Sequence, residues 1–555
     1  MTSGYSRRVS RRTVLGAAAA TTAAVAGSSL LGACGSNSDG RGSSRQGSAV
    51  SQDELLDLTP TYRPIELVPP DLPATEEGAM PGYTSYPQEL VQAIEEPPGT
   101  GGDEFTATTP AWWPIPPGLG DNSYYDAVNA ALNATIRFNI VSGTDYRDRL
   151  AAILAAGDIT DLMVITDWDR PAGFSEAVTA LFAPLTEYLA GDAALEYPHL
   201  AALPSRAWTS GVWNGELYGI PFTTGDFPFA LFYRADILEE MGIPEPRNAD
   251  EIYEFGREVT DARAGRWAFG DMLNEMVRAF GAPQDWRVEN GELVNQIETE
   301  EYAAAVEFTR RLYTEGLVHP DIVAGAADVK QLFESGALLM YWDGLGGWRE
   351  ALQRQLPVNP NFRMQPVAPY AADGGEPIYY YNEASTILTY LRKDLSRERI
   401  EEILRILNYI SSPFGTQEHF LIEYGVEGQH NTRGTNGAPT LTSLGQREVT
   451  ITYRFLSGMP PAVYQSEFPG YVEAYYNWHV EASRYKRVSM RDGLHIEEPS
   501  HLIDLGQRTQ DRVLNIVRGR EPLEELENVV NWWRRNGGDE LRDFYTEVFT
   551  DAGRM

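Results

Sequence analysis

Residues 135–165 read TIRFNIVSGTDYRDRLAAILAAGDITDLMVI, and this stretch decides the fold class. Residues 135–141 have the composition of a strand, and residues 145–156 carry apolar side chains at helical spacing. Gly157 ends the helix, and the wholly apolar run 162–165 predicts a buried strand. A helix between two strands is typical of a parallel, doubly wound sheet. The stretch therefore predicts an α/β fold.

Tryptophans follow two strands of this predicted sheet. Residues 105–109 form another predicted strand, after which come Trp112 and Trp113, and Trp168 follows the strand 162–165. The carboxyl ends of parallel strands meet at one edge of a sheet, where ligands bind. We therefore expect these tryptophans to lie at a ligand-binding edge.

Short motifs farther along the chain carry a family resemblance. Residues 213–222 read WNGELYGIPF, residues 233–238 read YRADIL, and Asn248 with Glu251 forms a helix-cap pattern. In this order the motifs resemble the extracellular solute-binding proteins of carbohydrate ABC importers. Further matches are GD at 157–158, GLVHP at 316–320, FESG at 333–336 and YGVEGQH at 424–430. The last motif is similar to the large oligosaccharide lipoprotein branch associated with aldouronate-type ligands, and the resemblance spans about residues 103–550.

The resemblance implies a two-lobe periplasmic-binding-protein-like fold. In such a fold, hinge strands join two α/β lobes, and the ligand lies in the cleft between them. Crossings between the lobes are expected near residues 221–224 and 379–383. Lobe 1 is expected to comprise residues 103–221 and 384–455, and lobe 2 residues 222–383 and 456–555.

The first 34 residues predict export and lipid anchoring. Residues 10–16, SRRTVLG, resemble the twin-arginine export motif, and an Ala- and Thr-rich stretch follows instead of the roughly 20 strongly apolar residues of a membrane span. Residues 31–34, LGAC, resemble the bacterial lipobox, and Cys34 is the one cysteine of the chain. We therefore predict a signal peptide over 1–33, lipidation of Cys34 and a location on the extracytoplasmic face of the cell membrane. A tether and an extended, proline-rich arm are predicted over 34–102.

The charge of the chain argues against some partner classes. With 45 Lys and Arg against 79 Asp and Glu, the net charge is −34, and such a surface repels phosphate backbones and anionic lipid headgroups. The sequence has no Gly-x-x-x-x-Gly-Lys-Ser/Thr loop, no Cys cluster and no His-x-x-x-His pair. We therefore expect no nucleic acid partner, no cofactor and no metal, with a structural calcium site as the open alternative, and we expect the transport ATPase to be a separate chain.

Sugar binding needs flat aromatic faces for the C–H surface of a pyranose and planar polar groups for its hydroxyls. The candidate ligand contacts are Trp112, Trp113, Trp168, Trp342 and Trp348 for the faces, and Asp169, Asp226, Asp343, Asn382 and Glu383 for the polar groups. The segment 342–348, WDGLGGW, is favoured, because its glycines allow close backbone approach between two aromatics. For each tryptophan, packing in the core is the alternative.

The resulting hypothesis is a monomeric, lipid-anchored binding protein, not an enzyme, that captures an oligosaccharide for the membrane permease of an ABC importer. The rival hypothesis is a secreted glycoside hydrolase with Asp343 and Glu383 as its paired carboxylates. The identity of the ligand stays open, because a disaccharide, a glycoside or a peptide also fits. Arg170 and Arg349 could pair the carboxylate of a uronic acid or carboxylates of the protein itself.

Overall fold

The computed structural model describes residues 48–171, 173–223, 225, 227, 229–325, 328–381, 385–491 and 494–555. The predicted signal peptide, Cys34 and three candidate ligand contacts, Asp226, Asn382 and Glu383, lie outside these residues. Residues 46–555 form one compact unit by themselves. Among the helices in the described part of the chain, none combines the length and the apolar character that a membrane span requires.

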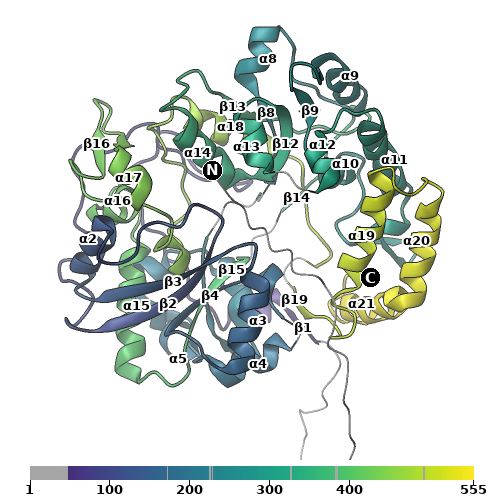
Figure 1. Ribbon diagram of the computed structural model, residues 1–555. Coiled ribbons are helices and arrows are strands. Elements are labelled where there is room, and N and C mark those ends of the chain that lie inside the picture. Colours follow the sequence, from purple (N-terminus) through teal and green to yellow (C-terminus); the bar gives the residue numbers. More distant parts are fainter. Residues whose placement is uncertain are drawn as a thin grey trace, which may run out of the picture. The chain divides into compact units, whose positions relative to one another are not determined.

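A five-stranded sheet forms the centre of one half of this unit (Figure 1). Its order is β3-β2-β4-β15-β7. The strands are β2 Glu104–Ala111, β3 Thr135–Ser142, β4 Leu162–Thr166, β7 Gly219–Pro221 and β15 Ile387–Leu391. The predicted strand-helix-strand order is confirmed, with β2 parallel to β3 and β4. β15 returns from far along the chain and pairs antiparallel with β4 and β7.

Helices cover both faces of this sheet. In β4, Leu162 and Val164 belong to one hydrophobic cluster and Met163 and Ile165 to another, because successive side chains of a strand point to opposite faces. The first cluster includes α2 (Ser123–Leu132) and α15 (Arg397–Ile410), and the second includes α3 (Tyr146–Ala156) and α4 (Phe174–Leu181). We call this sheet with its covering helices lobe 1.

A four-stranded sheet of order β13-β8-β12-β9 forms the centre of lobe 2 (Figure 1). Its strands are β8 Phe229–Arg234, β9 Trp267–Phe269, β12 Leu338–Gly344 and β13 Met364–Pro366. One core joins residues 227–379 to residues 463–549, because helices from the end of the chain pack against those that follow β8. These helices are α9 Ala249–Val259, α10 Leu273–Ala279, α11 Glu300–Thr314, α18 Tyr471–Ser483, α19 Leu505–Val517, α20 Glu525–Trp533 and α21 Asp539–Asp551.

Shorter elements complete the two lobes. The helices are α5 Thr186–Leu189, α6 Pro198–Ala201, α7 Ser205–Trp208, α8 Ala235–Met241, α12 Pro320–Ala324, α13 Val329–Glu334, α14 Leu345–Gln355, α16 Gln417–Tyr424 and α17 Ser443–Glu448. The strands are β5 Val212–Trp213, β6 Glu216–Leu217, β10 Trp286–Glu289, β11 Glu292–Asn295, β14 Tyr379–Tyr380, β16 Asn431–Arg433, β17 Pro439–Leu441 and β18 Lys486–Arg487.

The two cores are connected by three stretches of chain, at residues 222–227, 379–387 and 459–463. The backbone N–H of Phe222 donates to the carbonyl of Ile387 at 2.9 Å. Beside this bond, the N–H of Gly458 donates to the carbonyl of Pro221, also at 2.9 Å. The three crossings are therefore hydrogen-bonded to one another where they leave lobe 1, as the strands of a hinge would be.

The N-terminal arm is bonded to both lobes. The N–H of Arg63 donates to the carbonyl of Ala201 of lobe 1 at 2.8 Å, and the hydroxyl of Tyr476 in α18 donates to the carbonyl of Pro73 at 2.7 Å. No helix or strand lies between residues 57 and 103, all of which the structure describes. The start of the arm differs from the predicted extended segment, because β19 (Leu494–Glu497) supplies an antiparallel partner to β1 (Ser48–Ser51), and α1 (Gln52–Leu56) follows.

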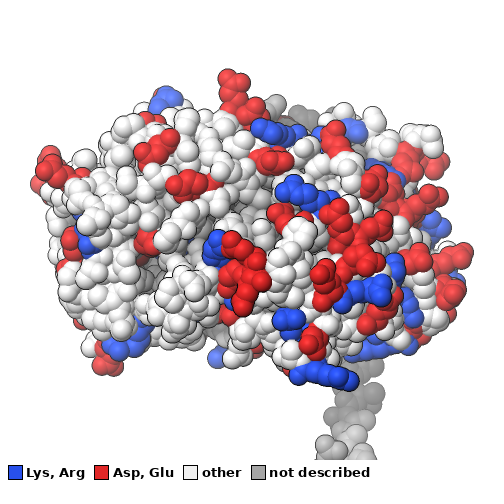
Figure 2. Space-filling view, turned by 90° about the horizontal axis from the view of Figure 1, so that it is seen from above, with Lys and Arg blue, Asp and Glu red and all other residues white. Residues whose placement is uncertain are grey.

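Charged side chains are unevenly spread over the face of the molecule that is seen from above in Figure 2. Figure 2 shows acidic and basic groups gathered on the side of α11 and the C-terminal helices, whereas the opposite side is largely uncharged. Both signs are present there, as in the first turn of α11 with Glu300 and Glu301 and its last turn with Arg311. Acidic groups prevail, in line with the net charge of −34.

Candidate ligand-binding site

Two tryptophans of lobe 1 lie beside each other at the carboxyl edge of the sheet. Trp112 follows β2 and Trp168 follows β4, and because these strands are paired in parallel, their ends share an edge. Trp112 is 43% exposed and Trp168 is 46% exposed, and their ring centroids lie 5.9 Å apart. The structure thus brings two predicted residues together with much of each ring open to solvent.

Lobe 2 presents a second aromatic pair. Trp342, near the end of β12, stacks on Phe229 at the start of β8, with ring centroids 4.1 Å apart and planes 13° from parallel. The antiparallel register places Phe229 opposite Gly344, two residues beyond Trp342, so that the rings are diagonal neighbours. The pair borders a cavity of about 350 Å³. Sequence reasoning missed Phe229, whose only signal is its position as the first residue of a strand.

The two pairs flank the first crossing between the lobes. Phe455 contacts both Trp112, at a centroid distance of 6.3 Å, and Phe222, at 4.9 Å, which places the lobe 1 pair where the crossing begins. Phe229 stands where the crossing enters β8. We call Trp112, Trp168, Phe229 and Trp342 the hinge aromatics.

The predicted acidic contacts that the structure describes are already bonded within the protein. Asp169 is buried, accepts a hydrogen bond from the Thr166 hydroxyl at 2.6 Å and lies 3.7 Å from Arg147. Asp343 accepts from the Tyr341 hydroxyl at 2.8 Å. Asp169 therefore stabilises the end of β4 through its hydrogen bond to Thr166, and its side chain is not open to a ligand. In the described part of the chain, no three His, Cys, Asp or Glu side chains are grouped so as to hold a metal ion.

Trp348 and Trp113 differ from the expectation of open ring faces. Trp348 is 0% exposed, and its ring packs against Tyr471 at a centroid distance of 4.8 Å. It lies on the face of α14 that meets α18, so the structure makes it a core residue of lobe 2. Trp113 is half-buried and packs edge-on against Phe455.

The two arginines considered for a uronic acid differ in their partners. The guanidinium of Arg349 pairs with Glu423 at 3.1 Å. The guanidinium of Arg170 lies 5.2 Å from the ring centre of Trp213, and its Nε and Nη2 are buried. For Arg349 the structure favours the alternative of a protein carboxylate.

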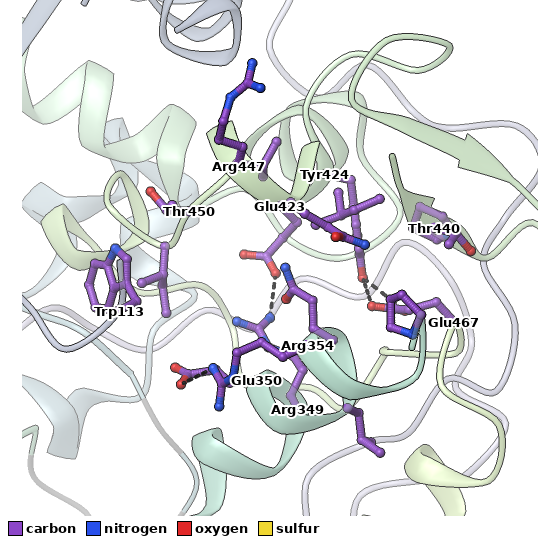
Figure 3. Close-up of a pocket in the computed structure, with 18 of the residues that line it drawn as sticks. Trp113, Arg349, Glu350, Arg354, Glu423, Tyr424, Thr440, Arg447, Thr450 and Glu467 are labelled. Atoms are coloured by element: carbon purple, nitrogen blue, oxygen red, sulfur yellow. Dashed lines mark hydrogen bonds and ion pairs between the residues drawn. The ribbon is translucent and has the colours of Figure 1, made fainter. Parts of the chain in front are cut away.

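A larger cavity, of about 570 Å³, lies between α14 of lobe 2 and α16 and α17 of lobe 1 (Figure 3). We call it the α14 cavity. The side chain of Glu423 at its wall is 4% exposed and is paired from both lobes, by Arg349 in α14 and by Arg454 at 3.1 Å. Burial alone would raise the pKa of this carboxyl, but the two arginines lower the pKa of Glu423 to about 2. Glu423 directly precedes the 424–430 motif, and this position is the sequence feature that could have marked it as a site residue.

A second acid at the α14 cavity has the opposite character. Glu467 accepts from the Tyr424 hydroxyl at 3.5 Å, and burial raises the pKa of Glu467 to about 8. Two carboxyl groups of one cavity therefore differ in charge at neutral pH. Glu423 is ionised, whereas Glu467 is largely protonated.

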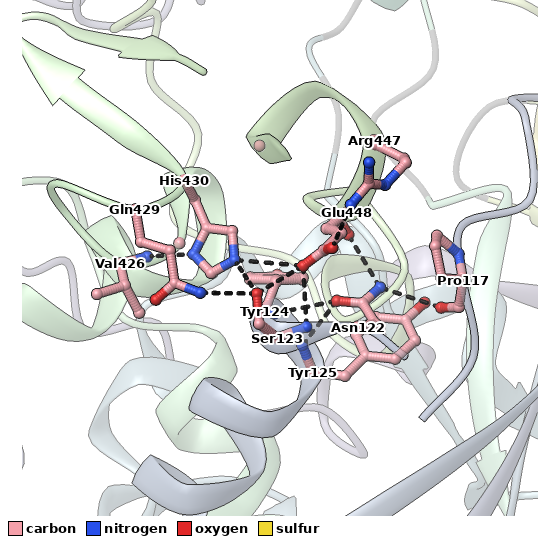
Figure 4. Close-up of polar contacts among 12 residues, drawn as sticks. Pro117, Asn122, Ser123, Tyr124, Tyr125, Val426, Gln429, His430, Arg447 and Glu448 are labelled. Atoms are coloured by element: carbon pink, nitrogen blue, oxygen red, sulfur yellow. Dashed lines mark hydrogen bonds and ion pairs between the residues drawn. The ribbon is translucent and has the colours of Figure 1, made fainter. Parts of the chain in front are cut away.

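A serine, a histidine and a glutamate meet at the start of α2 (Figure 4). The Ser123 hydroxyl donates to Glu448 at 2.6 Å and lies 2.9 Å from Nε2 of His430. The backbone N–H of Val426 donates to Nδ1 of His430 at 3.0 Å, so in the neutral imidazole Nε2 carries the hydrogen and cannot accept the serine proton. The hydrogen bonds from Ser123 and Arg447 outweigh burial and lower the pKa of Glu448 to about 2. The group fastens α2 to α17 and is not arranged as a nucleophile with its base.

Comparison with known proteins shows which proteins the chain resembles. The family of bacterial extracellular solute-binding proteins matches the chain over residues 118–386, which contain the crossing at 222–227 and reach into the crossing at 379–387. Over this stretch, just under half of its length, the chain is similar to that family. Lipoprotein LipO of Bacillus subtilis (strain 168), 22% identical over 450 residues, aligns with 75% of this chain and 86% of its own length. The polygalacturonan/rhamnogalacturonan-binding protein YtcQ of the same organism, also 22% identical, aligns with 52% of this chain and 59% of its own.

Solved structures of two-lobe solute-binding proteins share the fold. The N-glycan transport solute-binding protein NgtS from Streptococcus pneumoniae, in complex with Man1GlcNAc, superimposes with a TM-score of 0.59 at 13% identity, over 81% of this chain and 99% of its own. The alginate-binding protein AlgQ2 gives 0.58 at 15% identity, over 83% and 100%. The two-lobe α/β fold is thereby confirmed, and the matched family and these neighbours are binding proteins rather than enzymes.

Proposed function

We propose that this protein captures an oligosaccharide outside the cell and delivers it to the membrane permease of an ABC importer. The observation that carries the proposal is the set of hinge aromatics, with one pair on each lobe at the two ends of a crossing. Exposed rings in such a position offer apolar faces to the C–H surfaces of sugar rings. The names of YtcQ, AlgQ2 and NgtS, which all refer to saccharides, support this ligand class.

The polar part of the site is proposed from the crossings. The proposed contacts are Asp226, which stands three residues before Phe229 in the sequence, and Asn382 and Glu383, which follow the aromatic run 379–381. Carboxylate and amide groups pair with sugar hydroxyls, and from a crossing they would meet a ligand held by either lobe. Asp343, at the end of β12, would add a carboxylate from lobe 2.

Ligand capture is proposed to close the lobes about the hydrogen-bonded crossings. The proposed bodies are residues 103–221 with 384–455 and residues 222–383 with 456–555. A ligand that contacts both lobes binds the closed arrangement more tightly than the open one, and so shifts the population toward closure.

The protein is proposed to act as a monomer held at the extracytoplasmic membrane face by lipid on Cys34 after twin-arginine export. The lipobox-like residues 31–34 and the name of LipO support the anchor. A Cys34→Ala variant expressed in a lipoprotein-processing host is expected to move from the membrane fraction to the medium or periplasm. Retention of that variant in the membrane would contradict the anchor.

Binding without turnover separates this proposal from a glycoside hydrolase. The test is a thermal-shift and tryptophan-fluorescence screen of the chain after Cys34 against neutral and uronic oligosaccharides, with product analysis of each hit. A hit that raises the melting temperature and is recovered intact supports a receptor. A hit that is recovered cleaved contradicts it and makes Asp343 and Glu383 catalytic candidates.

A further inference from the structure

The α14 cavity begins one residue away from the hinge aromatics. Trp112 is one of them, whereas the next residue, Trp113, lines the cavity (Figure 3). Phe455 packs against both rings, at centroid distances of 6.3 Å and 5.0 Å. A chain-like ligand that stacks on Trp112 therefore has the cavity within reach of its next units.

Both lobes contribute to the wall of the cavity. Leu352 and Gln353 come from α14 of lobe 2, whereas Ile422 and Leu441 come from α16 and β17 of lobe 1. The volume of about 570 Å³ falls within the roughly 300–1,000 Å³ of small-molecule pockets. An occupant would contact both lobes at once, as a ligand that favours closure must.

The arginines of the cavity are neutralised before any ligand enters. Each lies within ion-pair distance of a carboxylate of the protein. The pairs are Arg349 with Glu423 at 3.1 Å, Arg354 with Glu334 at 2.6 Å and Arg447 with Glu448 at 3.0 Å. A uronate would have to compete with these carboxylates for the same guanidinium groups, so the pairing disfavours an acidic occupant.

The cavity wall also holds Glu350, which pairs with Arg354 at 3.6 Å, and the rest of the lining is mixed in polarity. Thr440, Thr450 and Gln446 supply hydroxyl and amide groups among apolar side chains. The Glu467 carboxyl is largely protonated at neutral pH, because burial raises its pKa to about 8. Apolar faces interrupted by neutral hydrogen-bonding groups match a sugar ring, which has C–H surfaces and hydroxyl edges.

We propose that the α14 cavity receives uncharged sugar units of an oligosaccharide whose neighbouring unit stacks on the hinge aromatics. This inference rests on the proposed function. It adds that the ligand is long enough to occupy both places and that its part in the cavity carries no carboxylate.

The test measures affinity by titration calorimetry along two series of probes. Neutral gluco- and fructo-oligosaccharides and oligogalacturonates, each from monosaccharide to hexasaccharide, are titrated into the chain that starts after Cys34. The neutral series is expected to bind more tightly as it lengthens, with about a tenfold gain or more between disaccharide and the longest member, and to exceed the uronate series.

Variants that fill the cavity separate this inference from the proposed function. Gln353→Trp in α14 and Thr440→Trp in β17 place an indole in the cavity from opposite walls, and each is expected to weaken long neutral ligands about tenfold while leaving disaccharide binding unchanged. The control is Val358→Trp, since Val358 is 77% exposed and lies outside the cavity wall. Circular dichroism and the melting temperature verify that each variant is folded.

The results of these titrations distinguish failure of the cavity proposal from failure of the proposed function. Loss of long-ligand affinity in both cavity variants but not in the control supports the inference. Unchanged long-ligand affinity in a folded cavity variant, or tighter binding of the uronate series, overturns the inference and leaves the proposed function standing. Binding of no saccharide by the unmodified chain contradicts the proposed function and this inference with it.

Discussion

The hinge aromatics and the α14 cavity lie one residue apart, at Trp112 and Trp113, yet they use their side chains in opposite ways. At the hinge, rings of Trp112 and Trp168 stay open to solvent at nearly half of their surface. At the α14 cavity, the side chain of Glu423 is buried and its charge is met by arginines from both lobes. An open ring contributes little to folding and is available to a ligand, whereas a buried ion pair becomes costly when one partner is removed.

Substitutions in the two regions should therefore differ in whether they lower ligand affinity or the stability of the fold. Changes at the hinge aromatics should lower affinity with little loss of stability. Changes to the ion pairs of the α14 cavity should lower stability first, because they leave a buried charge without its partner.

The largest effect is expected for Glu423→Gln. The variant leaves Arg349 and Arg454 without a carboxylate between them, which should cost about 3–5 kcal/mol of unfolding free energy. Urea denaturation followed by tryptophan fluorescence measures the change. The matched control is Glu427→Gln, four residues later and exposed, whose pair with Arg433 is 3.8 Å long and should change stability by less than about 1 kcal/mol. Equal effects of the two variants would refute the distinction between the regions.

The next effect is expected in binding. Trp112→Ala removes one open ring face and should weaken the tightest saccharide ligand by about 2 kcal/mol, roughly 30-fold, with a stability change within about 1 kcal/mol. Titration calorimetry and thermal unfolding measure the two quantities. Tyr62→Ala in the arm, where the ring is equally exposed at 44%, serves as the control and should leave affinity unchanged. If Trp112→Ala lost stability and kept its affinity, the hinge aromatics would not be the site.

The smallest of the three effects is the one expected from a change of one pH unit. Glu467 faces Arg349, Glu423 and Tyr424, and because burial raises its folded pKa to about 8, the folded state holds a proton that the unfolded state releases above about pH 4.5. The unmodified chain should therefore lose stability relative to Glu467→Gln, by about 1.4 kcal/mol for each pH unit between those values. Urea denaturation of both proteins across this range measures the difference. A constant difference would show that Glu467 is ionised throughout.

Local patterns predicted the fold because they depend on neighbours in sequence. The strand-helix-strand run from Thr135 to Ile165 gave the parallel sheet, and the positions of Trp112 and Trp168 after paired strands were enough to bring their rings together. The return of β15 between β4 and β7 could not be predicted in this way, because its register depends on contacts more than 160 residues apart along the chain.

The parts of the site that sequence reasoning missed depend on distant partners. Trp348 looked like a second ring face of the segment that holds Trp342, but it packs against Tyr471 of α18 more than a hundred residues later. Arg349 has its carboxylate 74 residues away, in α16. Phe229 becomes a site candidate only through the pairing of β8 with β12.

Binding at the hinge aromatics can be seen in a crystal structure of the chain after Cys34 with its tightest-binding oligosaccharide. The account predicts an intact saccharide with one ring against Trp112 or Trp168, the lobe 2 pair of Phe229 and Trp342 in contact with the same ligand, and the lobes closed around it. A saccharide bound elsewhere, with no contact to any of the four hinge aromatics, would contradict the proposed site.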